Sequence, residues 1–346
     1  DAGIMRTNLA DQFEATAGMA SGIRAYAATR GIDSDPIARA CRLDPDRFDV
    51  IGERVSLDRL CRFMEALALV SGDDLFGLKS ADMFEAGSSG PFGYALMNAP
   101  TIRDLLVFLG RNLHKAGETS ICTLEIGTRE THFEWAYSPL ILHHDQYVDL
   151  GVAQTMRHLK AILGDDINQA RLELVRKKPT NSSLHRQLLT RNVIFGAPVN
   201  AFILPSEFLG RANPQADPKL FAIMSQQMDT VQIRRAGMHD PVTAIRLNLA
   251  DNMATKVPTL AQQAERLGMS PRTLQRRLTE AGTSMQGLLD ECRSEMAQRL
   301  LLETNLSLSA IGYRLGFSAP AAFTRSAIRW FGVPPSQYRQ SQRAKL

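Results

Sequence analysis

The stretch LAQQAERLGMSPRTLQRRL, residues 260–278, decides the fold of the last third of the chain. Thr259 and Gln262 have the spacing of a capping box at its start, and apolar residues follow at helical intervals. Gly268 is typical of a helix end, because glycine adopts positive φ without steric cost. Ser270, followed by proline, then has the features of an N-cap that starts a second helix. Two short helices joined by a glycine-containing turn predict a helix-turn-helix unit.

The same pattern occurs a second time, 48 residues later. The segment LSAIGYRLGFS (308–318) matches LAQQAERLGMS (260–270) in its Leu, Arg, Leu, Gly and Ser, so Ser318 is expected to cap the second helix of this copy. Between the copies, residues 284–304 carry apolar side chains at steps of three and four, which predicts a long amphipathic helix. The C-terminal region is therefore predicted to be all-α, with two helix-turn-helix units joined by a linker helix.

Positive charge is concentrated in this region. Residues 241–346 contain fourteen Lys or Arg against seven Asp or Glu, although the whole chain of 346 residues has a formal net charge of only +4. The first 240 residues are slightly acidic by difference. This asymmetry predicts a polyanionic partner for the C-terminal region alone.

Residues 241–346 closely resemble the DNA-binding module of the AraC/XylS family of bacterial transcription regulators. The signature lies in the RLGF turn, the Phe-x-Arg pair and the closing WFG-x-x-PSQYR of the second unit. The resemblance implies a sequence-specific regulator, and an activator, whose partners are double-stranded promoter DNA and RNA polymerase. The resemblance is also compatible with a homodimer.

The first recognition helix is predicted to bind DNA more specifically than the second. Leu274 and Leu278 should face inward, which leaves Arg272, Thr273, Gln275 and Arg276 to face a groove, where Arg and Gln can read guanine and adenine. Three arginines are expected to hold phosphates, namely Arg277, Arg266 and Arg314. The second helix offers mainly small or apolar side chains, and its expected contacts are Ala321, Ala322, Arg325 and Arg329.

The first 240 residues mix helical and strand patterns, which predicts an α+β domain with a mostly antiparallel sheet. Helical periodicity covers residues 56–72, 99–117 and 145–164. A hairpin is expected over 119–137, and further strands over 170–178 and 198–205. The predicted organisation is a ligand-sensing domain at 1–222, an interdomain linker at 223–240 and the DNA-binding domain at 241–346.

The N-terminal domain resembles the α/β sensor domain of a subgroup that includes regulators of amino-acid use, more than the β-barrel sugar-binding domain of other AraC/XylS members. The resemblance implies control by a small-molecule effector, which it does not identify. The residues considered for its pocket are Phe84, Tyr94, Arg103, Trp135 and Tyr137, although aromatic residues in such segments also serve as plain core. A domain that only dimerises or binds a protein partner is the alternative.

Several other chemistries find little support in the sequence. The four cysteines, Cys41, Cys61, Cys122 and Cys292, form no CxxC pair, so reduced and mostly buried thiols are expected, with no metal and no cofactor. A DNA-repair methyl-acceptor enzyme would need a cysteine in a reactive setting, which these lack. No apolar run is long enough to span a membrane, and residues 1–8 show no apolar signal core, so a cytoplasmic protein is expected. Residues 143–145, His-His-Asp, are a weak candidate for metal ligands, and Arg176 is expected at a solvated strand end.

Overall fold

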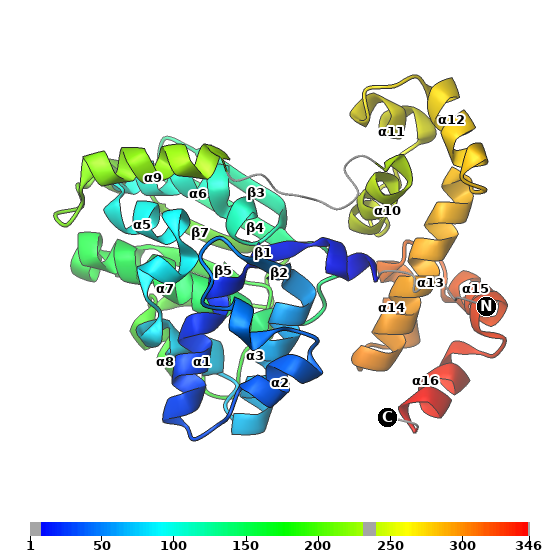
Figure 1. Ribbon diagram of the computed structural model, residues 1–346, viewed down its shortest axis with the longest axis horizontal. Helices are drawn as coiled ribbons and strands as arrows, with labels where there is room; N and C mark the ends of the chain where they lie inside the picture. The colour runs from blue at the N-terminus through cyan, green and yellow to red at the C-terminus, as the bar shows by residue number, and fades with distance from the viewer. Residues whose placement is uncertain (1–7, 231–239, 345–346) are drawn as a thin grey trace. The chain divides into compact units, whose positions relative to one another are not determined.

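The computed structural model describes residues 8–230 and 240–344, and the chain divides into two compact units at residues 233 and 234. Figure 1 shows their elements, with unit 1 in blue to green and unit 2 in yellow to red. Helix α9 (Pro218–Thr230) is the last described element of unit 1, so the predicted linker at 223–240 overlaps this helix as far as residue 230. Residues 231–239 of the linker, like the N-terminal stretch 1–7, lie outside the described residues.

Unit 1 is built on a five-stranded sheet in the order β3-β4-β7-β5-β6. Neighbouring strands run antiparallel except for β5 and β6, which are parallel, so the mostly antiparallel sheet was predicted correctly. The hairpin and the two further strands expected from the sequence are present, whereas β6 was not predicted. The strands are β3 (Thr119–Ile126), β4 (Glu130–Tyr137), β5 (Arg171–Leu174), β6 (Asn192–Phe195) and β7 (Asn200–Pro205). A separate two-stranded sheet pairs β1 (Glu14–Thr16) with β2 (Arg54–Ser56).

Two long helices of unit 1 begin at their predicted caps. Ser56 accepts a hydrogen bond from the backbone N–H of Arg59 at the start of α3, and Thr101 accepts one from Asp104 at the start of α6. Both caps satisfy backbone donors that the first helical turn leaves unpaired. The helices before α9 are α1 (Ala20–Thr29), α2 (Asp35–Ala40), α3 (Leu57–Ser71), α4 (Phe76–Ser80), α5 (Pro91–Asn98), α6 (Ile102–Ala116), α7 (Asp145–Leu163) and α8 (Ser183–Leu188).

An aromatic cluster on β4 and β7 forms one side of the unit 1 core. The rings of Phe133 and Trp135 stack with centroids 5.7 Å apart, and Phe202 lies 5.1 Å from Trp135. All three side chains are buried. Phe133 and Trp135 point to the same face of the sheet because they alternate along β4, and Phe202 lies opposite Phe133 on β7. This face is the one that α5, α6 and α7 approach.

A buried ionic cluster beside α7 corrects the prediction for Arg176. Arg176 is only 7% exposed, and its guanidinium forms an ion pair with Asp149 and donates to the carbonyl oxygen of Asp74 at 3.2 Å. His185 Nε2 lies 3.2 Å from the same Asp149 carboxylate. The chain following β5 therefore carries this arginine into the interior, where an acidic partner offsets the cost of removing its charge from water.

Unit 2 is all helical, as predicted, and contains both helix-turn-helix pairs. Its helices are α10 (Pro241–Asn252), α11 (Leu260–Arg266), α12 (Pro271–Glu280), α13 (Met285–Glu303), α14 (Leu308–Arg314), α15 (Pro320–Phe331) and α16 (Pro335–Arg343). The capping box of Thr259 and Gln262 is present, and Ser270 caps α12. The prediction for Ser318 is wrong: Pro320 occupies the first helical position of α15, which makes Ala319 the N-cap residue, with no side-chain cap.

Helix α13 joins the two pairs of unit 2, and Figure 1 shows it between α12 and the α14–α15 pair. Its buried face carries the predicted apolar residues, among them Leu288, Cys292 and Met296. Arg293 of this helix donates from Nε to the carbonyl oxygen of Leu315 at 2.8 Å and from Nη2 to that of Gly316 at 3.2 Å. Its guanidinium also lies 4.7 Å from the ring centre of Phe317. One side chain therefore holds the turn of the second helix-turn-helix against the linker helix.

Candidate nucleic-acid interface and ligand cavity

Helix α12 presents a continuous polar face. Leu274 and Leu278 are buried, and the four polar residues between and beside them are exposed: Arg272, Gln275, Arg276 and Arg277. Buried leucines at a spacing of four fix which side of the helix faces the core of unit 2, so the long polar side chains must point away from it. The structure thus brings three of the four predicted groove-facing residues, Arg272, Gln275 and Arg276, onto the exposed side of the helix.

Two of the predicted groove-facing side chains, Thr273 and Arg276, have partners within unit 2. The hydroxyl of Thr273 lies 2.8 Å from that of Ser270, and the Thr273 N–H donates to Ser270, so this side chain is half-buried in the helix cap. Arg276 Nε lies 3.6 Å from Glu280, with the two side chains 72% and 64% exposed. An ion pair so exposed contributes little and does not hold the arginine away from a ligand.

Helix α15 presents a smaller polar surface than α12. Phe323 and Ala327 are buried, whereas Ala321 and Arg325 are exposed and Ala322 is half-buried. Ile328, which is 43% exposed, lies one turn beyond Arg325 on the same face. This face therefore combines one exposed cation, Arg325, with aliphatic side chains.

Arg329 of α15 has a structural partner that the sequence analysis did not identify. Its guanidinium forms an ion pair with Asp290 of α13, and the other oxygen of the same carboxylate accepts a hydrogen bond from Trp330 Nε1 at 2.9 Å. Asp290 thus holds the C-terminal half of α15 against the linker helix. Together with Arg293, it is a positioning residue that sequence reasoning missed, since its partners are about 40 residues away.

Arg266 and Arg314, the other expected phosphate contacts, are both exposed at the ends of the first helices of the two pairs. Arg266 also donates to the carbonyl oxygen of Ala244 at 2.9 Å, which ties α11 to α10. Both guanidinium groups therefore lie on the surface of unit 2, as a phosphate contact requires.

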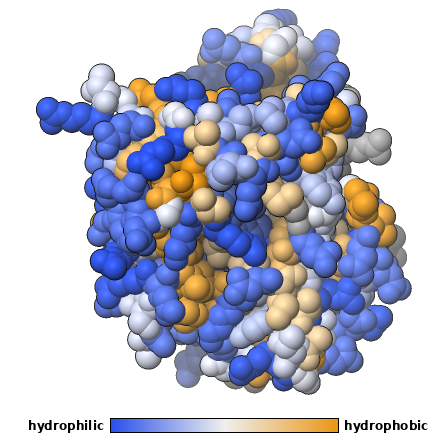
Figure 2. All heavy atoms as spheres, turned by 90° about the vertical axis from the view of Figure 1, so that its left-hand side faces the viewer, coloured by the Kyte–Doolittle hydropathy of each residue, from blue (hydrophilic) through white to orange (hydrophobic). Residues whose placement is uncertain are grey.

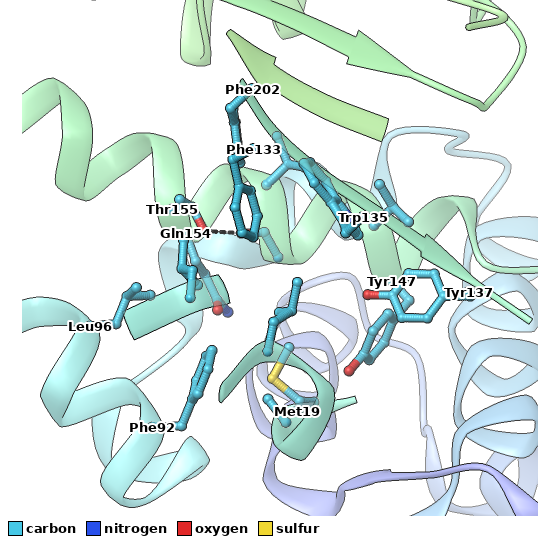
Figure 3. A pocket seen from close by; sticks show the side chains of 16 residues that line it. Met19, Phe92, Leu96, Phe133, Trp135, Tyr137, Tyr147, Gln154, Thr155 and Phe202 are labelled. Atoms are coloured by element: carbon cyan, nitrogen blue, oxygen red, sulfur yellow. Dashed lines mark hydrogen bonds between the residues drawn. The ribbon is translucent and has the colours of Figure 1, made fainter. Parts of the chain in front are cut away.

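Unit 1 contains a cavity between the sheet and helices α5, α6 and α7 (Figure 3). Its volume is about 50 Å³, and it is lined by aromatic side chains from the strands, aliphatic side chains from the helices, and Met19. Trp135 and Tyr137 line it, as the sequence suggested for a ligand pocket. Tyr147 of α7 faces Tyr137 edge to face at 5.7 Å, and burial raises the pKa of both phenols well above their usual value.

The remaining residues considered for the pocket lie elsewhere. Phe84 lines a second, more open pocket of about 270 Å³ between α5 and α7, and Tyr94 lines a third beside the loop that follows Phe48. Arg103 is exposed in the first turn of α6 and lines none of these three pockets. The structure therefore joins only two of the five proposed residues in one cavity.

Gln154 of α7 is a cavity residue that the sequence analysis missed. Its side chain is 9% exposed, and its Nε2 has no hydrogen-bond partner among the described residues. A polar residue within an amphipathic helix is usually solvated, so no local pattern predicts that this amide lies inside the domain. On the face of unit 1 shown in Figure 2, hydrophilic residues predominate and apolar residues form small separate patches, whereas the lining of the cavity is almost entirely apolar.

The four cysteines are free thiols, of which Cys61 and Cys292 are buried and the other two are half-buried. Within residues 8–230 and 240–344, no three His, Cys, Asp or Glu side chains gather in a way that could hold a metal ion. Over the same ranges, every helix is too short or too polar to cross a membrane.

Comparison with known proteins matches both units. Residues 31–213 match a family model described as the arabinose-binding domain of AraC transcription regulator, N-terminal, and residues 263–341 match a helix-turn-helix domain model. The chain is 29% identical to the HTH-type transcriptional regulator VirS of Mycobacterium tuberculosis, over 89% of this chain and 91% of that protein. It is 23% identical to the ornithine utilization regulator of Pseudomonas aeruginosa, over 90% of this chain and 92% of that protein. The crystal structure of the transcriptional regulator CdpR from the same species aligns with a TM-score of 0.37 at 20% identity, covering 92% of this chain and 96% of that one.

Proposed function

Because the chain belongs to the AraC family of transcription regulators, we propose that it recognises promoter DNA by placing α12 and α15 in successive major grooves, and that α12 supplies most of the base readout. The chain is a helix-turn-helix DNA-binding transcription regulator. This family consists of regulators and not of enzymes, so the methyl-acceptor alternative is set aside.

The exposed face of α12 is the observation that carries the proposal. Arg272, Gln275 and Arg276 project from one surface of a helix whose opposite face is anchored by two buried leucines. Arg matches the O6 and N7 acceptors of guanine with two hydrogen bonds, and Gln matches N7 and N6 of adenine. Arg277, Arg266 and Arg314 are proposed to hold phosphates, which sets the register of the protein without reading sequence.

Helix α15 is proposed to add affinity with less specificity. Ala321 and Ala322 can touch a thymine methyl but cannot distinguish base pairs by hydrogen bonds. Arg325 is the long polar side chain best placed to reach a base or phosphate. Arg329 is proposed to act on DNA mainly through the position of α15, since Asp290 already binds its guanidinium.

Selection from random double-stranded DNA with the full-length protein tests this function. Enrichment of one defined sequence, bound with an affinity that falls steeply as salt rises, is expected, because Lys and Arg release counterions from phosphates. The absence of any enriched sequence, or an affinity insensitive to salt, would contradict the proposal.

We further propose that unit 1 controls transcription through a small-molecule effector and that the protein activates RNA polymerase. The mainly apolar cavity, with an amide that has no partner among the described residues, supports the effector, since ligand sites are commonly apolar with a few placed polar groups. In the competing function, unit 1 binds no effector and only dimerises or binds a protein partner. Promoter-reporter transcription with purified polymerase, with and without a metabolite extract, separates the two.

A further inference from the structure

We propose that the effector is an uncharged, mainly apolar molecule with a hydrogen-bond acceptor, held in the cavity of unit 1 with Gln154 as its donor. This inference rests on the proposed effector control and specifies the chemistry of the ligand. It is drawn from the composition of the cavity lining, one unpartnered polar group, and the relation of the cavity to the neighbouring pocket.

The cavity lining cannot balance an ionic charge. None of its residues is ionised at neutral pH, and its polar side chains are limited to two tyrosines, Gln154 and Thr155. The hydroxyl of Thr155 already donates to the carbonyl oxygen of Gly151 at 3.0 Å. Burial raises the pKa of both phenols, so they remain protonated and neutral. Burying an unpaired ion is strongly unfavourable, so the site selects against charged ligands.

Gln154 is the group that a ligand would complete. Its Nε2 is buried and has no partner within the described residues, and Figure 3 shows the side chain reaching into the space between Leu96, Phe92 and Met19. A buried donor without a partner is unfavourable, so a carbonyl, ester or ether oxygen at this point would relieve the penalty. The ligand is therefore expected to carry an acceptor beside an apolar body.

The neighbouring pocket indicates how such a ligand enters. A cavity of about 50 Å³ has room for a water molecule but is smaller than the roughly 150 Å³ that accommodates benzene in a well-studied engineered protein. The outer pocket, of about 270 Å³, shares Phe92, Leu96 and Gln154 with the cavity. Displacement of Phe92 would join the two spaces and bring the volume near the lower end of the range for ligand sites, about 300–1,000 Å³.

The outer pocket adds little that would favour an anion. Arg157, its only cationic side chain at neutral pH, donates to the carbonyl oxygen of Ala81 at 2.7 Å and is exposed, so that solvent and salt screen its charge. Burial lowers the pKa of His158, which also lines this pocket, to about 4, so the imidazole is neutral at physiological pH. An amino acid such as ornithine, named in one relative, or a sugar such as arabinose, named in the family description, would leave several polar groups unpaired.

Entry of a ligand would also reach the helix that precedes unit 2 in the chain. The ring of Phe92 lies 5.5 Å from that of Phe108 on α6, and Phe108 lies 5.9 Å from Phe221 on α9. Lys115 of α6 additionally donates to the carbonyl oxygen of Met228 on α9 at 2.6 Å. A displaced Phe92 therefore changes the packing beneath α9, which gives the effector a route to alter the DNA-binding properties of the chain.

Gly151 offers a direct test of the site. It lies on α7 in the cavity lining, and a Cβ added there meets no atom within 4 Å. Gly151→Leu should fill the cavity, whereas Gly151→Ala should leave most of it open. Calorimetric titration of the full-length protein would use acetophenone as the uncharged probe, and benzoate and L-ornithine as charged probes.

We expect saturable binding of acetophenone to the native protein and to Gly151→Ala, and at least a tenfold loss of affinity in Gly151→Leu. Gln154→Leu should weaken binding by about two- to tenfold, the value of one neutral hydrogen bond. Lys160→Gln, on the exposed side of α7, is the matched control and should have no effect. All four variants should bind DNA as the native protein does without ligand, which verifies folding.

Three results would overturn the inference: no binding of acetophenone, tighter binding of benzoate or L-ornithine, or equal binding by Gly151→Leu. If charged metabolites then changed DNA affinity, effector control would stand and only the assigned chemistry would be wrong. If no component of a metabolite extract changed DNA affinity or transcription, effector control itself would be refuted.

Discussion

Arg276 and Arg277 are neighbours on α12, and we expect them to act differently on DNA. Both side chains are exposed, but only Arg276 is proposed to read a base. Arg276→Ala should weaken binding to the preferred site by about 1–3 kcal/mol and relax the preference at one base pair, as a lost bidentate contact does. Sequencing of sites selected by the variant measures this directly, and an unchanged base preference would contradict the reading role.

Arg277→Ala is the matched comparison. Because a phosphate contact carries no sequence information, this variant should weaken binding to preferred and unrelated DNA by similar factors and reduce the dependence of affinity on salt. Titration of both DNAs at several salt concentrations provides the measurement. A change confined to the preferred site would instead assign Arg277 to base readout.

Single residues also show what the sequence could not predict. Arg176 was misplaced because its partners, Asp149 and the carbonyl oxygen of Asp74, are distant in the chain and meet it only in the folded domain. Gln154 was missed for a similar reason: the helical pattern of α7 does not reveal which polar residue faces a void. Trp135 and Tyr137 share one face of β4 because alternate residues of a strand point the same way, a local property, and both line the cavity; their role toward a ligand stays a prediction.

At the level of elements, the two helix-turn-helix units are unequally capped, which leads to a stability prediction. Ser270 accepts a hydrogen bond from the backbone of Thr273 at 3.1 Å, whereas Ser318, its counterpart in the repeat, precedes an uncapped helix. Ser270→Ala should therefore lower the free energy of unfolding of unit 2 by about 1 kcal/mol. Ser318→Ala should change the free energy of unfolding by only about a few tenths of a kcal/mol, because this side chain caps no helix. Chemical denaturation monitored by circular dichroism compares the two variants.

Arg293 should matter for the second unit more than for the first. Its contacts with Leu315, Gly316 and Phe317 fix the turn before α15, but none of them involves α11 or α12. Arg293→Ala should reduce protection of the α15 half of the binding site while leaving the α12 half protected. Hydroxyl-radical footprinting resolves the two halves, and an equal loss in both would show that Arg293 supports the whole unit and not one turn.

The elements themselves were largely predictable, since their signals are local. Capping residues and apolar periodicity located α3, α6 and α7 and the helices α11 to α13 within a few residues. Strand β6 was missed because four residues with alternating burial give too short a pattern to distinguish from a loop. The start of α15 was shifted by one residue, since Pro320 outweighs the capping preference of Ser318.

At the level of the whole molecule, unit 2 contains both recognition helices, so one protomer should bind a DNA site that has no two-fold symmetry. Successive major grooves on one side of a duplex lie about 34 Å, or 10–10.5 base pairs, apart. We expect a non-palindromic site with one sharp block of bases and one degenerate block about one helical turn apart. Footprinting combined with site selection tests this, and two equally sharp inverted repeats would contradict it.

The distribution of tryptophan has a practical consequence. The chain contains two tryptophans, and the structure places one in each unit: Trp135 lines the cavity, and Trp330 donates to Asp290 between α13 and α15. Each unit therefore carries its own intrinsic fluorophore, in the cavity lining of unit 1 and on the recognition helix α15 of unit 2. Trp135→Phe leaves emission that reports on DNA, and Trp330→Phe leaves emission that reports on the cavity. Stopped-flow fluorescence of these two variants would show whether ligand entry precedes, follows or accompanies engagement of the promoter.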